Sequence, residues 1–431
     1  MPLSDVFAPF QSLRNPVFAR LYAAQTTSLL GDALTWVGLA LLAFELGGED
    51  SAQILAFALT LRVTAFVLLS PLAGVLADRL NRKFILVTAD VVRMGVIALL
   101  PFVTEVWQVY TLMFVVNAFT AFFTPTFQAV IPAVTTDDEF PQAISLSGAT
   151  YELLGVLGPG LAGAVAAFMG ARNIFFLDAA TFLVSGVLVL TLPGRLQSPE
   201  AEAAQARPGA EVPRVSVKTL LEGTRRLWTD GLMRYALLLE LVAAVSGALI
   251  LVNTVGYVEG QLGLDTAHYG WVMSAFGVGA TAAALLTGVL DKRLARTTFV
   301  LVGALLTTLA VLPANRAGLG PLLVLWLVAG AGQNWVNLTT QTIIAEQTPE
   351  EFQGRVYGAH FAWSHLWWAF AYPLAGFLGT RYTTGSFLYG GLVALALLAG
   401  TWLLSRRRPE PLRVGEILPE SLSERRGQEA G

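Results

Sequence analysis

Long runs of apolar residues follow one another along almost the whole chain, separated by short clusters of charged residues, glycine or proline. A helix needs about 20 apolar residues to cross the hydrocarbon core of a bilayer. Runs of that length predict an all-α membrane protein with twelve transmembrane helices. The expected spans lie near residues 18–46, 52–77, 84–104, 107–130, 142–168, 173–193, 233–257, 270–290, 297–315, 320–345, 356–379 and 384–404.

The composition favours a membrane protein and excludes several other classes. The chain is 55% hydrophobic and 13% charged, about half the charge of a typical soluble domain. It has no cysteine and only three scattered histidines, which excludes disulfides, thiolate metal sites and cysteine nucleophiles, and no metal is expected. A net charge of −3 offers no basic surface for nucleic acid. Because no nucleophile and base occur at a fixed spacing, neither an enzyme nor a cofactor is expected.

The basic residues predict how the spans are oriented. Of the 27 Lys and Arg residues, two fall within spans and three in one set of loops, which leaves 22 on the opposite face. By the positive-inside rule that face is cytoplasmic. We therefore expect a multi-pass protein of the inner (plasma) membrane with both termini in the cytoplasm. No cleavable signal peptide is expected from the first residues.

One long connection, at 194–231, separates the sixth span from the seventh. Its first part is rich in Ala, Glu, Pro and Gln, as in a flexible linker. Its second part has the apolar and basic faces of a helix that lies at the membrane surface. The expected organisation is an N-terminal six-helix half at 1–193, this linker, a C-terminal six-helix half at 232–405 and a cytoplasmic tail at 406–431.

The two halves carry matching loops at nearly the same offset. Residues 74–82 resemble residues 288–296, which lie 214 positions later, and residues 136–140 resemble residues 348–352, which lie 212 positions later. Two loops in the same register indicate two pseudo-symmetric halves. This is a transporter architecture with the substrate site between the halves.

The same residues resemble a known family. The segment with Gly74, Asp78, Arg79, Arg82 and Lys83 is similar to the loop signature G-x-x-x-D-R-x-x-R-[KR] of the major facilitator superfamily. Four further segments resemble its enterobactin-exporter-like efflux branch, and they are Asp90 with Arg93, 122–132, 178–182 and 354–356. The resemblance extends from about Arg14 to Arg406. It implies the MFS fold and transport of a small molecule.

The loop signature also has a physical interpretation of its own. Gly74 permits close packing of helices, and Asp78 lies where Arg79, Arg82, Lys83 and the start of the next helix can stabilise its carboxylate. The resemblance implies a cytoplasmic gate latch that breaks when the protein opens inward. The alternative is that these basic residues only satisfy the positive-inside rule.

A second motif lies in the fifth span. Gly155, Gly158 and Gly163 offer small surfaces for close packing, and Pro159 frees a backbone carbonyl, so this helix is expected to pack closely and to bend. The segment resembles the G-x-x-x-G-P motif of antiporters in the superfamily, with one residue fewer between the first two glycines. Ordinary glycine packing is the alternative.

Charged residues at membrane depth are costly and are therefore functional candidates. We expect Asp32, Arg62 and Glu152 to form the proton-coupling set, because a carboxylate holds its proton more or less tightly as an arginine moves away or approaches. A permanent ion pair that only orients helices is the alternative. Asp90 and Arg93 are three residues apart and are interpreted as a local structural pair.

Polar and aromatic residues within the spans are candidates for a substrate cavity. An amide and aromatic lining suits a large amphipathic substrate that binds through ring stacking and buried area. An aromatic belt at the membrane interface is the alternative. The candidates are Gln25, Asn117, Glu240, Asn253, Gln333, Asn337 and Trp363. Because spans eight to twelve have no acidic residue in their interiors, coupling is expected mainly in the first half.

The expected function is secondary active efflux of an amphipathic organic compound, such as a drug or a siderophore-like molecule, in exchange for protons. No Walker-type phosphate loop occurs, so ATP hydrolysis by this chain is not supported. The alternatives are a symporter or a lipid or lysolipid flippase of the same fold and, more remotely, a non-transporting membrane receptor. The expected partners are the small-molecule substrate, protons and membrane lipid, and the protein is expected to work as a monomer.

Overall fold

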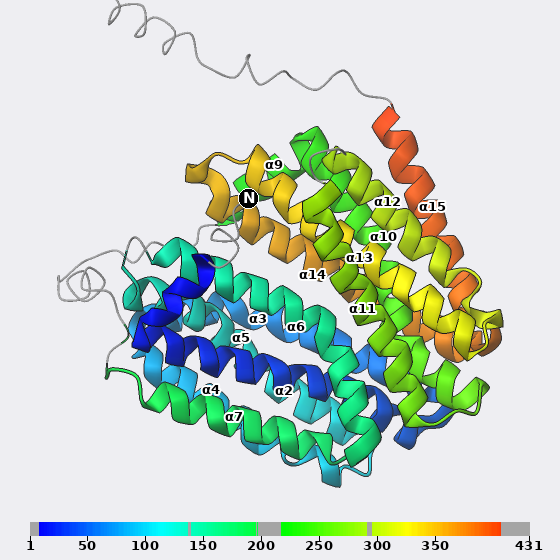
Figure 1. Cartoon of the computed structure of the whole chain (residues 1–431), viewed down its shortest axis with the longest axis horizontal. Coiled ribbons are helices and arrows are strands. Elements are labelled where there is room, and N and C mark those ends of the chain that lie inside the picture. The colour runs from blue at the N-terminus through cyan, green and yellow to red at the C-terminus, as the bar shows by residue number, and fades with distance from the viewer. Residues whose placement is uncertain (1–7, 137–138, 195, 197–216, 291–294, 407–431) are drawn as a thin grey trace, which may run out of the picture.

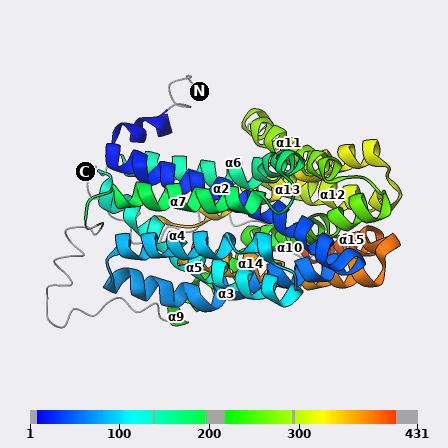
Figure 2. The same cartoon turned by 90° about the horizontal axis from the view of Figure 1, so that it is seen from below.

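Helices form all the regular structure in the described part of the chain. The computed structural model describes residues 8–136, 139–194, 196, 217–290 and 295–406, with the backbone alone at some positions inside helices, chiefly 70–79. The helices run side by side in two groups, one from each half of the chain (Figures 1 and 2).

Each half contributes six long helices within these ranges. The N-terminal half has α2 (Pro16–Gly47), α3 (Ser51–Arg79), α4 (Arg82–Ile97), α5 (Val106–Val134), α6 (Phe140–Met169) and α7 (Ile174–Leu190). The linker carries α9 (Val217–Thr229). The C-terminal half has α10 (Gly231–Val255), α11 (Thr266–Leu290), α12 (Arg296–Val311), α13 (Leu319–Gln347), α14 (Glu350–Arg381) and α15 (Ser386–Arg406).

Short helical turns begin the chain or join the long helices. They are η1 (Ala8–Arg14), η2 (Gly48–Asp50), η3 (Leu100–Phe102), η4 (Gly256–Gln261), η5 (Ala314–Arg316) and η6 (Thr383–Gly385). Among the described residues, eight helical stretches are long and apolar enough to cross a membrane, and one of them, Pro16–Leu69, takes in both α2 and most of α3. The all-α membrane fold is thus confirmed, and the number of twelve crossings stays a prediction.

A side-chain cap fixes the start of α2 and ties it to α6. Asn15 accepts hydrogen bonds from the backbone N–H groups of Val17 and Phe18 at 3.0 and 3.2 Å, which satisfies donors that the first turn leaves free. The Nδ2 group of Asn15 donates to Glu139 Oε2 at 2.9 Å. This hydrogen bond holds the pKa of the Glu139 carboxyl below its usual range.

The packing of the helices repeats between the halves. α2 packs against α6 and α7 as α10 packs against α14 and α15, and α4 packs against α5 as α12 packs against α13. The halves meet where α3 contacts α14 and where α6 contacts α11. Because α3 and α6 occupy the same places in their half as α11 and α14 do in theirs, these two contacts are equivalent, as expected for pseudo-symmetric halves.

The halves approach most closely at one end. We call the end of the bundle at which α9 lies the α9 end, and the opposite end, at η2 and η6, the far end. Near the far end a Cβ added to Gly163 would overlap the backbone of Gly270, and one added to Gly379 would lie 2.5 Å from Cβ of Ala52. Nearer the α9 end the ribbons diverge (Figure 1), and a Cβ added to Gly155 would meet nothing within 4 Å.

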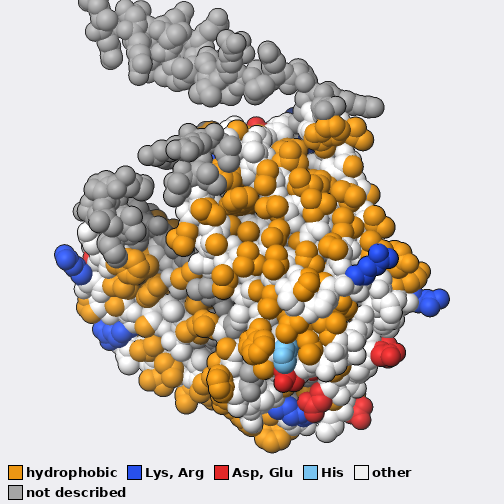
Figure 3. Space-filling view, turned by 45° about the vertical axis from the view of Figure 1, so that its right-hand side comes forward, with side chains coloured by type: hydrophobic (Ala, Val, Ile, Leu, Met, Phe, Trp, Pro, Cys, Tyr) orange, Lys and Arg blue, Asp and Glu red, His pale blue; other side chains and the backbone are white. Residues whose placement is uncertain are grey.

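The outer surface suits a lipid environment. Hydrophobic side chains cover the middle of the face in Figure 3, and charged side chains gather at its borders. Large apolar side chains stand exposed on several helices, for example Phe84, Phe168, Leu285 and Phe370. An apolar surface of this extent is costly in water and favourable in a bilayer.

Candidate functional site

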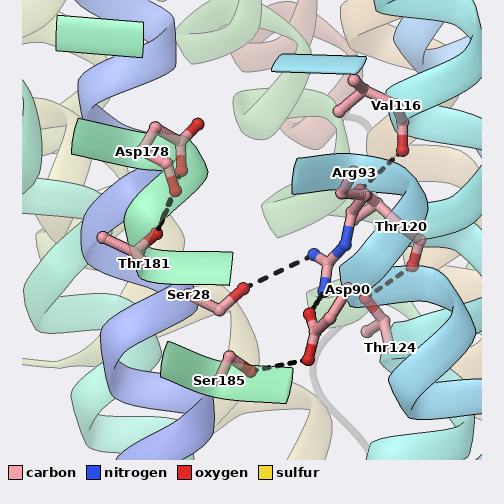
Figure 4. A network of polar contacts seen from close by, with 9 residues as sticks. All are labelled: Ser28, Asp90, Arg93, Val116, Thr120, Thr124, Asp178, Thr181 and Ser185. Carbon is pink, nitrogen blue, oxygen red and sulfur yellow. Dashed lines mark hydrogen bonds and ion pairs between the residues drawn. The ribbon is translucent and has the colours of Figure 1, made fainter. Parts of the chain in front are cut away.

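A buried ion pair joins three helices of the N-terminal half. Arg93 Nη2 donates to Asp90 Oδ1 at 2.5 Å, and the two side chains are 1% and 0% exposed. Ser185 Oγ of α7 donates to Asp90 Oδ2 at 2.8 Å, and Arg93 Nη1 donates to Ser28 Oγ of α2 at 3.4 Å (Figure 4). The pair predicted within α4 is therefore connected to α2 and α7. Such hydrogen bonds offset part of the cost of burying two charges.

Two aromatic rings enclose the Arg93 guanidinium. Its Cζ lies 4.3 Å from the ring centroid of Phe123 in α5 and 4.3 Å from that of Phe182 in α7. A ring face attracts a cation, most strongly where water is excluded. The rings thus stabilise the positive charge in the core of this half.

Asp178 of α7 is a second buried carboxylate, with 0% of its surface exposed. Thr35 Oγ1 of α2 donates to its Oδ2, and Thr181 Oγ1 donates to its Oδ1 at 3.1 Å. Gly31 of α2 faces the same carboxylate so closely that any added Cβ would overlap it. The close packing of α2 on α7 therefore depends on this glycine.

Asp32 lies on the face of α2 that carries Ser28 and Thr35. It is four residues after the first and three before the second, a spacing that puts all three on one side of a helix. The side chain is half-buried, and the positive charges of Arg93 and Arg62 lie within its electrostatic reach. The structure thus places Asp32 between the buried ion pair and the junction of the halves.

Arg62 of α3 lies at that junction. Its Cζ is 4.1 Å from the ring centroid of Trp36 in α2 and 5.9 Å from that of Phe66 in α3. The Phe66 ring stacks on His365 of α14 with centroids 6.0 Å apart. The charge of Arg62 also acts on His365 and Tyr372 of α14. Arg62 therefore links the acids of the N-terminal half to the opposite half.

The described residues of the gate motif bind backbone carbonyl groups. Arg82 Nη1 donates to the carbonyl oxygen of Ala129 in α5 at 2.8 Å, and Lys83 Nζ donates to that of Leu190 in α7 at 2.8 Å. At the equivalent place in the second half, Arg296 Nη2 donates to Glu346 Oε1 of α13 at 2.9 Å. The side chains of three members of the motif lie outside the described residues, namely Gly74, Asp78 and Arg79.

The glycines of α6 differ in their surroundings. Gly158 faces Ala33 of α2, and a Cβ added to it would lie 2.5 Å from the Ala33 Cβ, whereas Gly163 faces α11 and Gly155 faces open space. Two of the three predicted packing positions thus lie against other helices. The side chains of Pro159 and of the predicted coupling residue Glu152 lie outside the described residues.

Among the cavity candidates of the C-terminal half, two residues have buried polar atoms without a hydrogen-bond partner in the described structure. They are Asn253 at both side-chain atoms and Gln333 at Oε1, and the residues are 4% and 8% exposed. Gln333 Nε2 donates to Asn337 Oδ1 at 3.3 Å. A Cβ added to Gly247 of α10 would meet both Gln333 and the Trp368 ring. Unsatisfied amides beside an aromatic ring suit binding of a ligand.

The other cavity candidates have different surroundings. Gln25 Oε1 is buried without a described partner. Asn117 Nδ2 donates to the Met113 carbonyl of its own helix at 2.7 Å. Trp363 packs edge-on against Trp228 of α9, with centroids 5.0 Å apart, so it joins the linker helix to α14. Two surface hollows, of about 410 and 550 Å³, are lined by none of the candidates.

Several residues of this site were absent from the sequence prediction. The hydroxyl groups on α2 could have been found from their spacing to Asp32, because Ser28 and Thr35 share its helix face. Ser185 and Trp36 gave no signal, since their roles depend on how neighbouring helices are rotated. The pairing of His360 with Glu240 depends on such a rotation as well, and its Nε2 lies 3.0 and 2.9 Å from the two carboxylate oxygens of Glu240.

Sequence comparison agrees with this architecture. The profile of the Major Facilitator Superfamily matches residues 21–255 and 236–422. The chain belongs to this superfamily. This MFS protein is 28% identical to YfiS, an uncharacterised MFS-type transporter of Bacillus subtilis, over 79% of this chain and 81% of the relative. It is 24% identical to the multidrug efflux pump Tap of Mycolicibacterium fortuitum, over 89% of this chain and 93% of the relative. It is 26% identical to the enterobactin exporter EntS of Citrobacter koseri, over 94% of this chain and 96% of the relative.

Solved structures agree on the fold. The crystal structure of the nucleoside transporter NupG matches with a TM-score of 0.69 at 13% identity, over 91% of this chain and all of the other. At that identity the likeness concerns the fold alone. The chain is thus a multi-pass MFS transporter, and the resemblance to the branch that includes the enterobactin exporter is confirmed by its relatives.

Proposed function

We propose that this MFS transporter exports an amphipathic organic compound from the cytoplasm in exchange for protons. Efflux is supported by two relatives, a multidrug efflux pump and an enterobactin exporter. Coupling to protons is supported by the cluster of acids beside the junction of the halves. The substrate class is supported by the buried amides and aromatic rings on the α10, α13 and α14 side of that junction.

The main support for proton coupling is the net charge of this cluster of acids and arginines. Asp32, Asp90 and Asp178 share Arg93 as their buried cation, and Arg62 is the next nearest positive charge. With all five groups ionised, the cluster carries one unpaired negative charge. An uncompensated charge in a low-dielectric interior costs several kcal/mol. Binding of one proton removes that cost.

Movement of Arg62 gives the cluster a way to load and release the proton. Because Arg62 lies beside Phe66, whose ring stacks on His365 of the opposite half, a shift of α14 moves the Arg62 side chain relative to Asp32. When Arg62 is near, the carboxylate loses its proton more readily, and when Arg62 moves away, the proton binds. We assign proton transfer to Asp32, since it is the half-buried acid on this path, with Glu152 as the reserve candidate.

The direction of transport follows from the orientation. The positive-inside rule puts the α9 end in the cytoplasm, so close contact at the far end corresponds to an inward-facing protein. In that state substrate enters from the cytoplasm, and a change to contact at the α9 end would release it outside. The gate motif, with Arg82 and Lys83 bound to backbone carbonyls, lies at the end that must then close.

Inside-out vesicles with an acidic interior test this function. Wild-type protein should accumulate ethidium, an amphipathic planar cation, and release protons as it does so. Asp32→Asn should abolish uphill accumulation, a loss of at least about tenfold, yet retain exchange of labelled for unlabelled ethidium. The matched control is Asp50→Asn, an exposed acid in η2, which should behave as wild type. Full proton-driven accumulation by Asp32→Asn would assign coupling elsewhere, and the same assay on Glu152→Gln would locate it.

A further inference from the structure

A buried acid and imidazole face each other in the C-terminal half, away from the cluster described above. His360 Nε2 of α14 lies 3.0 Å from Oε1 and 2.9 Å from Oε2 of Glu240 in α10. Each residue is 8% exposed. Nearby, Trp367 Nε1 of α14 donates at 3.1 Å to the carbonyl of Leu237, which lies one turn before Glu240 in α10. The two helices are therefore held together by the acid–imidazole pair and by a neutral hydrogen bond beside it.

No other charged group of the described residues forms an ion pair with Glu240 or His360. On the same helix, His360 acts electrostatically on His365. The elements packed against α10 and α14 carry further titratable groups. Those with described side chains are Arg62 of α3, Glu222, Arg225 and Arg226 of α9, Arg20, Tyr22, Asp32 and Glu45 of α2, Glu49 and Asp50 of η2, Tyr257 and Glu259 of η4, Arg296 of α12, Glu346 of α13 and Tyr389 of α15. The two helices themselves also carry Arg234, Tyr235, Arg355, Tyr357, His365, Tyr372 and Arg381. Four of these compensate one another in two ion pairs, Arg355 with Glu222 and Arg296 with Glu346.

The charge of the pair therefore depends on its protons. With a neutral imidazole, Nε2–H donates to the carboxylate and the pair carries one negative charge. With an imidazolium, the pair is neutral and keeps the same hydrogen bonds. A buried carboxylate paired only with a neutral donor is costly, whereas a fully compensated pair is much less so. The site thus favours binding of one proton beyond the one on Nε2.

We propose that Glu240 and His360 form a second proton-binding site, in the half that sequence reasoning had left without one. Its place between α10 and α14 gives it a mechanical role. α14 contacts α3 of the other half and α9 of the linker. Loss of the proton weakens the attraction between α10 and α14 and lets α14 shift. Its role in transport rests on the proposed proton-coupled export, whereas its protonation does not.

The small number of histidines makes protonation directly measurable. Protein labelled with ¹⁵N-histidine should give ring-nitrogen signals from three imidazoles in nanodiscs, one pair per ring, because the chain has only three histidines. His268→Gln and His365→Gln each remove the signals of one ring, and the signals that remain in both variants belong to His360. We expect His360 to carry protons on both nitrogens at pH 7, and Glu240→Gln to remove that imidazolium signal at the same pH. A wild-type His360 that is singly protonated at pH 6 overturns the proposal, even if no Glu240 variant folds.

A transport measurement tests the coupling role. In proteoliposomes, the ratio of protons to ethidium should fall by one in His360→Asn and stay at the wild-type value in His268→Asn, a control histidine near the start of α11 that pairs with Asp265 instead. An unchanged ratio in His360→Asn overturns the coupling role. Wild-type ethidium transport without any proton movement would refute the proposed function instead, and it would leave the histidine signals to decide the binding site.

Discussion

Among the described residues of the N-terminal half, Arg93 is the one buried cation. Arg93 contacts Asp90, Ser28 and two aromatic rings, and it lies within electrostatic reach of Asp32. Its partners come from four helices. Removal of one member of a buried pair leaves an uncompensated charge, which is more costly than loss of the whole pair.

This arrangement predicts a specific pattern of stability. Arg93→Gln should lower the free energy of unfolding by about 3–5 kcal/mol, because Asp90 is left without its cation. The double variant Asp90→Asn with Arg93→Gln should recover a substantial part of that loss. Unfolding in mixed micelles measures both. Glu45→Gln is the control, since its pair with Arg172 has side chains 50% and 32% exposed and should contribute at most about 1 kcal/mol. Equal losses for Arg93→Gln and Glu45→Gln would contradict this account.

Part of the site could be predicted from the sequence and part could not. The spacing of Asp90 and Arg93 is local, so their contact followed from helix geometry, and the depth of Asp32 and Arg62 followed from counting along apolar runs. The threonine at 35 that binds Asp178 comes from a helix 143 residues away. Such a contact depends on how two helices are rotated against each other. Apolar runs do not encode that rotation.

Among the helices, the contact of α6 with α11 depends on glycine. Gly163 and Gly270 bring the two backbones together near the far end, and neither position has room for a side chain. Close approach of helices through small residues is common in membranes. The glycines in α6 were predicted as packing residues from sequence, but Gly270 was not, because a partner glycine on another helix is recognised only once the helices are paired.

Enlarging this contact should change the balance between conformations. Gly163→Leu should separate α6 from α11 at the far end and lower the population with that end closed. Spin labels at the far ends of these two helices, introduced as single cysteines into a chain that has none, should then report longer distances. Gly155→Leu is the matched control in the same helix, since its Cβ would meet nothing within 4 Å. If both variants give the wild-type distances, the glycine contact does not hold the far end closed.

For the whole molecule, the orientation in the membrane is the main prediction still to be measured. If the α9 end is cytoplasmic, a cysteine at Thr229, exposed at the end of α9, should not react with an impermeant thiol reagent added outside intact cells. A cysteine at Asp50, exposed in η2, should react within the same time. After permeabilisation both should react. Labelling of the Thr229 variant from outside would reverse the orientation and with it the proposed direction of transport.

Among the described residues no ion pair joins the halves at the far-end contact, and this has a consequence for the environment in which the protein works. All ion pairs between described residues join groups within one half or between α9 and α14, and the far-end contacts between halves use glycine, alanine and aromatic side chains. Dissolved salt screens exposed ion pairs but hardly affects van der Waals packing. A rise in salt should therefore not loosen the far-end closure, so a cell could pass from fresh water to brine without opening the resting state of this transporter at that end.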